Sequence, residues 1–219
     1  LTDDAKINRN APKAYQNLDR FIARKAVVKD LDKQNLIERI DSHTMMIPTA
    51  DRTNSVIEPY MTDQWFVKIK PLAEPAINAV KNGDIRFIPA NWEKTYFNWM
   101  ENIEDWCISR QIWWGHRIPV YYRDDETKVS LQDLDSSEGW KQDPDTLDTW
   151  FSSALWTWST LVDPEMADDF SLTFEEILER SPDFQKFHPT NIMETGYDIL
   201  FFWVARMILM TTYTVSYTH

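Results

Sequence analysis

The chain has 219 residues and a net charge of −12, and 43% of its residues are hydrophobic. This composition is typical of a globular domain with a core, and it excludes wholesale disorder. The single cysteine excludes an internal disulfide framework, and it favours a reducing, cytoplasmic setting. The longest apolar run, 199–210, contains Arg206 and is shorter than the ~20 residues of a membrane helix, so no membrane association is predicted.

The negative charge is concentrated in the segment 123–183. This segment has 17 acidic and 4 basic residues, a net charge of −13, whereas the rest of the chain has 18 acidic and 19 basic residues, a net charge of +1. A nucleic-acid-binding surface is expected to be basic. We therefore interpret the segment as a solvated acidic insertion and predict no nucleic-acid site in it.

In chain order, the first elements alternate between helical and extended patterns. Apolar residues at helical spacing predict a helix over 14–37, and dense turn-forming residues predict a loop over 41–59. The residues 71–82 predict a second helix that ends at an Asn-Gly pair. Short strands are expected on either side of it, at 64–70 and 85–89.

The segment 91–106 has the most regular pattern of the chain. Its apolar residues recur every three or four positions, at Trp92, Tyr96, Trp99, Ile103 and Trp106. This spacing places them on one face of a helix. An aromatic stripe of this kind is more often core than cofactor site, so we predict a buried helix that extends to about Ser109.

The second half predicts a further set of elements. They are a strand at 118–122, helices at 147–161 and 174–179, a strand at 189–194, and an apolar helix at 198–211. The acidic segment is otherwise expected to be loop. Alternation of strands with helices favours the α/β class. A strand, a turn at Gly196 and a buried helix together form the unit that nucleotide-binding sheets use.

Three stretches carry a resemblance to a known family. They are DWCISRQIWWGHRIP from Asp105, LDTWFSSALW from Leu147 and HPTNIMETGYDILFFWVARMI from His188. In this order they resemble the valyl-tRNA synthetases, a family of class I aminoacyl-tRNA synthetases. The resemblance covers nearly the whole chain. Isoleucyl and leucyl relatives share parts of the first and third stretches, but not the pair DTWFSSALW and GYDILFFW.

The resemblance implies part of a class I nucleotide-binding (Rossmann-like) fold, together with the tail of an inserted editing domain. It assigns residues 1–41 to that tail, 42–88 to a return connection, 89–123 and 147–214 to the catalytic fold, 124–146 to an acidic insertion, and 215–219 to a tail that is not native. It also implies the activity of a valine–tRNA ligase. Such an enzyme converts ATP and valine to valyl-adenylate, transfers the valyl group to tRNA(Val), and edits mischarged threonine.

Five residues are expected at the substrates by this resemblance. Trp114, Ile199 and Trp203 resemble the walls of the valine slot, and Gly196 and Asp198 resemble the adenosine contacts. Ile199 and Trp203 are four residues apart, which suits one face of a helix. Judged by their sequence alone, the three apolar residues are more readily explained as core, and it is the resemblance that favours the slot. Asp198 could also be a helix N-cap.

Three polar residues beside the expected slot, Arg110, Gln111 and His116, are interpreted differently. Arg110 and Gln111 are expected to make structural hydrogen bonds. His116 could touch a ligand, although a structural histidine is the more common case.

Two catalytic signatures of the class are absent from the sequence. Neither a His-Ile-Gly-His nor a Lys-Met-Ser-Lys-Ser element occurs. Both are expected to lie outside this chain, so we assign no catalytic residue and expect the isolated chain to be inactive. The expected cofactor is ATP as substrate, with Mg²⁺ in the complete enzyme. No zinc or other metal site is expected here, because the stretch 43–59 lacks cysteine.

The expected partners are tRNA(Val), valine and ATP, and the complete enzyme is expected to be a cytoplasmic monomer. Two alternatives remain open. One is part of an isoleucyl-tRNA synthetase. The other is a non-catalytic binding module with exposed tryptophans.

Overall fold

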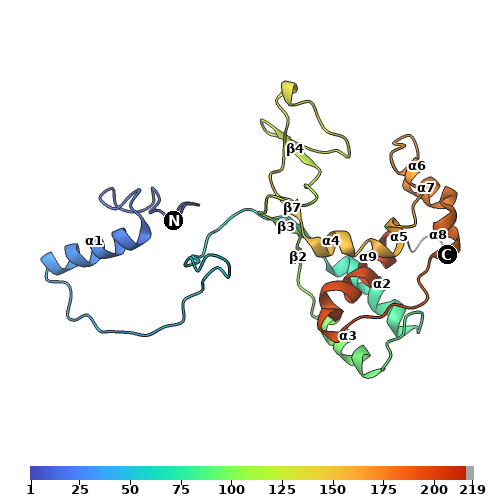
Figure 1. Cartoon of the computed structure of the whole chain (residues 1–219), viewed down its shortest axis with the longest axis horizontal. Helices are drawn as coiled ribbons and strands as arrows, with labels where there is room; N and C mark the ends of the chain where they lie inside the picture. The colour runs from blue at the N-terminus through green and yellow to red at the C-terminus, as the bar shows by residue number, and fades with distance from the viewer. Residues whose placement is uncertain (216–219) are drawn as a thin grey trace. The chain divides into compact units, whose positions relative to one another are not determined.

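The computed structural model describes residues 1–215. Its contacts divide the chain into two compact units, Leu1–Asp63 and Gln64–His219, which can be followed by colour in Figure 1. The boundary falls inside the segment 42–88 that the resemblance assigns to a return connection. The six-part division of the chain therefore stays a prediction.

The first unit is built around helix α1 (Arg20–Lys33). The helix begins at Arg20 because the Asp19 side chain accepts hydrogen bonds from backbone N–H groups of the first turn. It ends before Asn35, whose φ of +55° lies outside the right-handed helical region. The helix predicted over 14–37 is thus confirmed in its central part.

The rest of the first unit is largely irregular, in agreement with the loop predicted over 41–59. A short antiparallel bridge joins Thr49 to Val56. The Arg20 guanidinium lies 3.1 Å from the Glu58 carboxylate and donates to the Val56 carbonyl at 2.9 Å. These contacts connect the loop to the start of α1.

The second unit has a core of packed helices. The three longest are α2 (Lys70–Lys81), α3 (Asn91–Glu101) and α9 (Ala205–Thr214), and α4 (Thr149–Ser153) and α5 (Trp156–Ser159) pack beside α9. The buried side chains of α2 and α3 recur at helical spacing, at Leu72, Ala73, Ala76, Val80, Tyr96 and Met100. Helix α2 is therefore confirmed, one residue earlier than predicted.

The helix predicted to extend through Trp106 is wrong in its second half. Helix α3 ends at Glu101, and Trp106–Cys107 forms strand β2, which pairs antiparallel with strand β1 (Phe66–Val67). The predicted burial of the stripe is nevertheless confirmed at Trp106, which is 7% exposed in the core. The pairing with β1 replaces the helix because it satisfies backbone groups while keeping the indole buried.

All paired strands of the described residues are antiparallel and belong to three small sheets. Strands β3 (Ser109–Arg110) and β7 (Thr146–Leu147) form one two-stranded sheet beside that of β1 and β2. The third sheet has the order β5-β4-β6, with β4 (Val120–Arg123), β5 (Glu126–Val129) and β6 (Lys141–Gln142). The mixed α/β class and the strand predicted at 118–122 are confirmed.

Several local predictions of strand and loop are wrong, in both directions. The acidic segment, expected to be mostly loop, contributes β5, β6, β7 and a short 3₁₀ turn, η1 (Ser136–Glu138). Conversely, no strand forms at 85–89 or 189–194 among the described residues. The segment 189–194 has no neighbouring strand to pair with, and its Ile192 is 87% exposed.

The helix predicted over 147–161 is divided into α4 and α5. Asp148 caps α4 by accepting from the Trp150 N–H, which forces the chain to begin the helix after strand β7. The helix predicted at 174–179 is confirmed as α7 (Phe174–Arg180), with a capping box at its first turn. Two shorter helices flank it, α6 (Pro164–Ala167) and α8 (Pro182–Phe187).

The apolar helix predicted over 198–211 begins irregularly. A 3₁₀ turn, η2 (Tyr197–Ile199), and a π-helical turn, η3 (Leu200–Val204), precede α9. Val215 ends α9 and is buried. The expectation of a non-native tail at 215–219 lies outside the described residues from 216 onward.

Candidate functional site

The tryptophan loop, residues 111–116, connects strand β3 to the bridge at Arg117. The side chains at its apex are exposed to solvent, with Trp113 104% and Trp114 90% exposed. Its first residue is tied to polar neighbours by its side chain, because the Gln111 amide donates to the Asp145 carboxylate at 2.7 Å and to Gln64 at 3.1 Å. Trp114, an expected wall of the valine slot, thus faces outward from a loop that is anchored at its start.

The other expected slot residues lie in the turns that lead into α9. Ile199 ends η2, and Trp203 lies one turn further on in η3; both are partly buried. Trp203 packs against the helical core. A π-helical turn widens the helix locally and is frequent at functional sites. The structure therefore keeps Ile199 and Trp203 in adjacent turns, whereas the exposed Trp114 lies on a separate loop.

Gly196 and Asp198, the expected adenosine contacts, lie immediately before these residues. Gly196 is the cap position of η2, and no side chain caps this end of the helix. The expectation that Asp198 could be the N-cap is wrong, because it lies inside the first turn. A Cβ at position 196 would collide with the Asp198 carboxylate oxygen, so glycine leaves room for that carboxylate. Asp198 itself is exposed.

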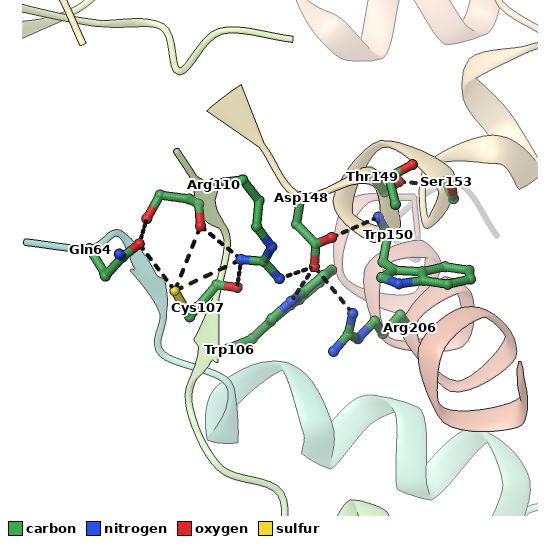
Figure 2. A network of polar contacts seen from close by, with 10 residues as sticks. Gln64, Trp106, Cys107, Arg110, Asp148, Thr149, Trp150, Ser153 and Arg206 are labelled. Carbon is green, nitrogen blue, oxygen red and sulfur yellow. Dashed lines mark hydrogen bonds and ion pairs between the residues drawn. The ribbon is translucent and has the colours of Figure 1, made fainter. Parts of the chain in front are cut away.

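A buried carboxylate joins the elements on which these residues stand. Asp148 is 3% exposed, and its Oδ2 lies 2.9 Å from Arg110 Nη2 and 3.4 Å from Arg206 Nη1. The same oxygen accepts from the Trp106 indole at 3.1 Å. Figure 2 shows these groups converging on Asp148 from β2, β3 and α9, while Asp148 also caps α4. We call Asp148, Arg110, Arg206 and Trp106 the Asp148 network.

The charges of the Asp148 network are unequally buried. The Arg206 side chain is 15% exposed and the Arg110 side chain 40%. Burial lowers the pKa of Arg206, and the carboxylate of Asp148 opposes that effect. The Arg206 guanidinium also lies 4.1 Å from the centre of the Trp106 ring, a cation–π contact. The charge of Arg206, which is the more buried of the two arginines, therefore needs the Asp148 carboxylate more than the charge of Arg110 does.

A second buried carboxylate, Asp143, lies at the edge of the three-stranded sheet. Its Oδ2 accepts from the Trp65 indole and from the Tyr122 hydroxyl, both at 2.8 Å. Burial alone would raise the pKa of Asp143, but these hydrogen bonds and one from the Asp145 N–H lower it overall. Burial, and then this carboxylate, raises the pKa of Tyr122 to about 12.

The polar residues of the first motif behave largely as expected. Arg110 donates to the carbonyls of Cys107 and Ser109 at 3.0 and 2.8 Å, so its structural role is confirmed. His116 Nδ1 lies 2.9 Å from Ser152 Oγ on α4.

Sequence reasoning missed Asp148, Arg206 and Ser152. An aspartate directly before a helical pattern is an N-cap signal, so Asp148 could have been found in that way. Nothing local in the sequence indicates the partners of Arg206 and Ser152.

The described residues contain no group of three or more metal-ligating side chains. This absence holds for the described residues only, and the expectation of no metal site stays a prediction. No helix within residues 1–215 is long and apolar enough to cross a membrane.

Comparison with known proteins gives consistent matches. A family model described as tRNA synthetases class I (I, L, M and V) matches residues 9–139 and 128–218. The valine–tRNA ligase of Legionella pneumophila (strain Paris) is 52% identical over 219 residues, which are 96% of this chain and 22% of the relative. That of Francisella tularensis subsp. tularensis is 49% identical over 225 residues, 99% of this chain and 23% of the relative.

The valine–tRNA ligase of Clostridium tetani is 49% identical over 215 residues, 95% of this chain and 23% of the relative. The chain thus spans less than a quarter of the length of the curated relatives it matches. The family model covers more than half of the chain, and the described strands and helices form the mixed α/β structure expected of this class. The chain belongs to the class I tRNA synthetases.

Proposed function

We propose that the chain is part of a valine–tRNA ligase. The complete protein would convert valine and ATP to valyl-adenylate and pyrophosphate, and then transfer the valyl group to tRNA(Val). The observation that carries this proposal is the 52% identity over 96% of the chain to a valine–tRNA ligase. Because the relatives are several times longer, the activity is proposed for the complete protein and not for these 219 residues alone.

We further propose that Trp114, Ile199 and Trp203 form walls of the valine slot. Two supports are the helical proximity of Ile199 to Trp203 and the outward-facing indole of Trp114. A slot of this kind selects by bulk, and one methylene changes discrimination by only ~1–3 kcal/mol. A hydroxyl isostere such as threonine is rejected poorly for the same reason, so the complete protein would also edit mischarged threonine.

Gly196 and Asp198 are proposed to contact the adenosine of ATP. Asp198 has no hydrogen bond or ion pair within the described part of the chain, so its carboxylate is available to accept from ribose hydroxyls. The Mg²⁺ that accompanies ATP would be held largely by the nucleotide phosphates. The described residues do not fit an all-protein metal site, and we assign none of them to the ion.

For the complete protein we propose the cytoplasm as location and a monomer as its state. The editing-domain tail at 1–41 and the acidic insertion at 124–146 are part of this proposal. The isoleucyl alternative remains the runner-up, since the family model also includes isoleucyl synthetases.

An amino-acid panel in ATP–pyrophosphate exchange tests the proposal on the complete protein. Valine should support exchange at lower concentrations than isoleucine, and a reversed preference would move the chain to the isoleucyl enzymes. Trp203→Ala should raise the KM for valine about tenfold or more, because it removes a slot wall worth ~1–3 kcal/mol. The matched control is Trp156→Ala, which changes a 62% exposed tryptophan on α5 outside the proposed slot. An equal KM in the two variants would remove Trp203 from the slot.

A further inference from the structure

The tryptophan loop is fixed at both ends, although its apex is bare. Before the loop, Arg110 pairs with Thr146 in the β3–β7 ladder. After the loop, Arg117 forms a bridge with the same Thr146. Both ends of the loop therefore stand on strand β7, and the loop cannot shift along the sheet without breaking one of these pairings.

Gly115 brings the returning end of the loop close to β7. Its φ is +150°, and a Cβ at this position would lie 3.2 Å from the Thr146 Cβ. Another residue would therefore be strained here by its backbone and crowded by Thr146. The next residue, His116, accepts a hydrogen bond from the Leu147 N–H at 2.7 Å through its carbonyl.

One side-chain contact extends this anchoring from β7 to helix α4. His116 Nδ1 and Ser152 Oγ are 2.9 Å apart, and Ser152 is partly buried on α4. Helix α4 starts directly after β7, and Asp148 fixes its first turn through the Trp150 N–H. The serine hydroxyl thus connects a rigidly held helix to the residue that lies two positions after Trp114.

We propose that Ser152 is a positioning residue, which acts through His116 to hold Trp114 in the orientation that binds the amino acid. This inference rests on the proposed function, in which Trp114 is a wall of the valine slot. A wall that is held in place before binding loses less conformational freedom when the substrate enters. The contact does not touch reacting atoms, so it should affect binding of valine and leave the chemical step largely unchanged.

The α4 helix supplies a matched control for this test. Ser153 is adjacent to Ser152, but its hydroxyl donates to the Thr149 carbonyl at 2.8 Å within the same helix. In the complete protein, Ser152→Ala should raise the KM for valine in ATP–pyrophosphate exchange about three- to tenfold, the range expected for one lost hydrogen bond. The kcat should change less than about twofold, because transition-state contacts are intact. Ser153→Ala should match the unaltered protein.

Ser152→Thr keeps the hydroxyl and should restore most of the affinity. If the threonine variant is as impaired as the alanine variant, or if Ser152→Ala changes kcat instead of KM, the proposal is wrong. Should Ser152→Ala not fold, as judged by its thermal unfolding, His116→Ala gives the same test from the loop side. His116 is exposed, so its replacement does not threaten the core.

Hydrogen–deuterium exchange separates this proposal from the proposed function. Amides in the peptide 111–117 should exchange faster in Ser152→Ala than in Ser153→Ala, whatever reaction the protein catalyses. Equal exchange in both variants would overturn the positioning role. Absence of valine-dependent pyrophosphate exchange in the unaltered protein would instead overturn the proposed function, and the exchange data would then decide the contact alone.

Discussion

Replacing Asp148 by asparagine tests whether the Asp148 network holds the second unit together. Asparagine keeps the size of the side chain and caps helices as well as aspartate does, so the α4 cap can survive. The negative charge is lost, however, and an amide cannot accept from Arg110, Arg206 and the Trp106 indole together. The variant therefore isolates the charge from the cap.

The magnitude follows from the burial of each partner. Removing one member of a buried ion pair costs ~3–5 kcal/mol, because the other charge is left without compensation. Arg206, with a side chain 15% exposed, falls near this class, although its 3.4 Å distance weakens the pair. Arg110 is 40% exposed and can be rehydrated, so its pair is worth about 0–1 kcal/mol. We expect Asp148→Asn to lower the free energy of unfolding by about 2–4 kcal/mol.

Urea unfolding of the chain near pH 7, followed by circular dichroism, measures this change. The matched control is Asp163→Asn, since Asp163 caps α6 by accepting from the Glu165 N–H and makes no ion pair among the described residues. This control should change stability by less than about 0.5 kcal/mol. If Asp148→Asn also changes the free energy of unfolding by less than about 0.5 kcal/mol, the buried carboxylate does not stabilise the unit through its ion pairs.

A double-mutant cycle identifies the partner. If Arg206 is the group left uncompensated, then Arg206→Met should recover about 1 kcal/mol or more of the loss in Asp148→Asn, within the range of measured coupling energies. Additive effects would mean that Arg206 and Asp148 do not interact appreciably.

Two further predictions concern other buried polar groups. Within residues 1–215, the Trp158 indole N–H is buried and has no hydrogen-bond partner, whereas that of Trp106 donates to Asp148. In urea unfolding, Trp158→Phe should therefore lower the free energy of unfolding by about 1–2 kcal/mol less than Trp106→Phe does. Equal decreases in the two variants would contradict a stabilising role for the Trp106 hydrogen bond. The pKa of Asp143 is lowered below its ordinary value of 3.8 in the folded chain. The ionised carboxylate therefore stabilises the fold above pH 3.8, and this stabilisation is lost as the pH falls through the lowered pKa. Tyr122→Phe removes one of the responsible hydrogen bonds, and it should flatten the loss of unfolding free energy below about pH 4; an unchanged slope would exclude this contact as the cause.

Local sequence patterns predicted burial better than they predicted the elements. The three-and-four spacing that ends at Trp106 correctly marked this residue as core, yet the helix stops at Glu101. The reason is that Trp106 lies opposite Val67 in a strand pair, a contact that links positions far apart in the sequence. Periodicity reports which side chains avoid water, but it does not report which backbone satisfies their hydrogen bonds.

The predicted strands formed to different extents: that at 64–70 is reduced to β1 (Phe66–Val67), which pairs with the distant β2, whereas that at 118–122 forms within a local hairpin. The strand at 118–122 is present because β4 is joined to β5 through Asp124, whose φ of +51° suits a tight turn. The segment 189–194 contains Pro189, Asn191 and Glu194, residue types that strands disfavour, and no neighbouring strand among the described residues pairs with it. Strand propensity indicates a half-buried surface and is expressed only when a partner is present.

The residues proposed to contact the substrate illustrate a further limit. The sequence places Ile199 and Trp203 on one helical face, and the structure keeps them in adjacent turns. The sequence could not indicate that Trp114 stands on a loop anchored by Thr146 and Ser152, because both anchors are more than 30 residues away along the chain. Contacts of this range depend on the fold as a whole.

The Asp148 network gives a physical reason why three separate motifs act together. Arg110 belongs to the first motif, Asp148 to the second and Arg206 to the third, and one carboxylate pairs with both guanidiniums. Loss of Asp148 leaves both guanidiniums without this partner, whereas loss of either arginine leaves Asp148 paired with the other. The same carboxylate starts α4, and the motif of Arg206 also contains the proposed slot residue Trp203. The network contains none of the residues proposed to contact valine, so under the proposed function a change in it should leave the preference between valine and isoleucine unaltered, unlike a change at the proposed slot residues Trp114, Ile199 and Trp203.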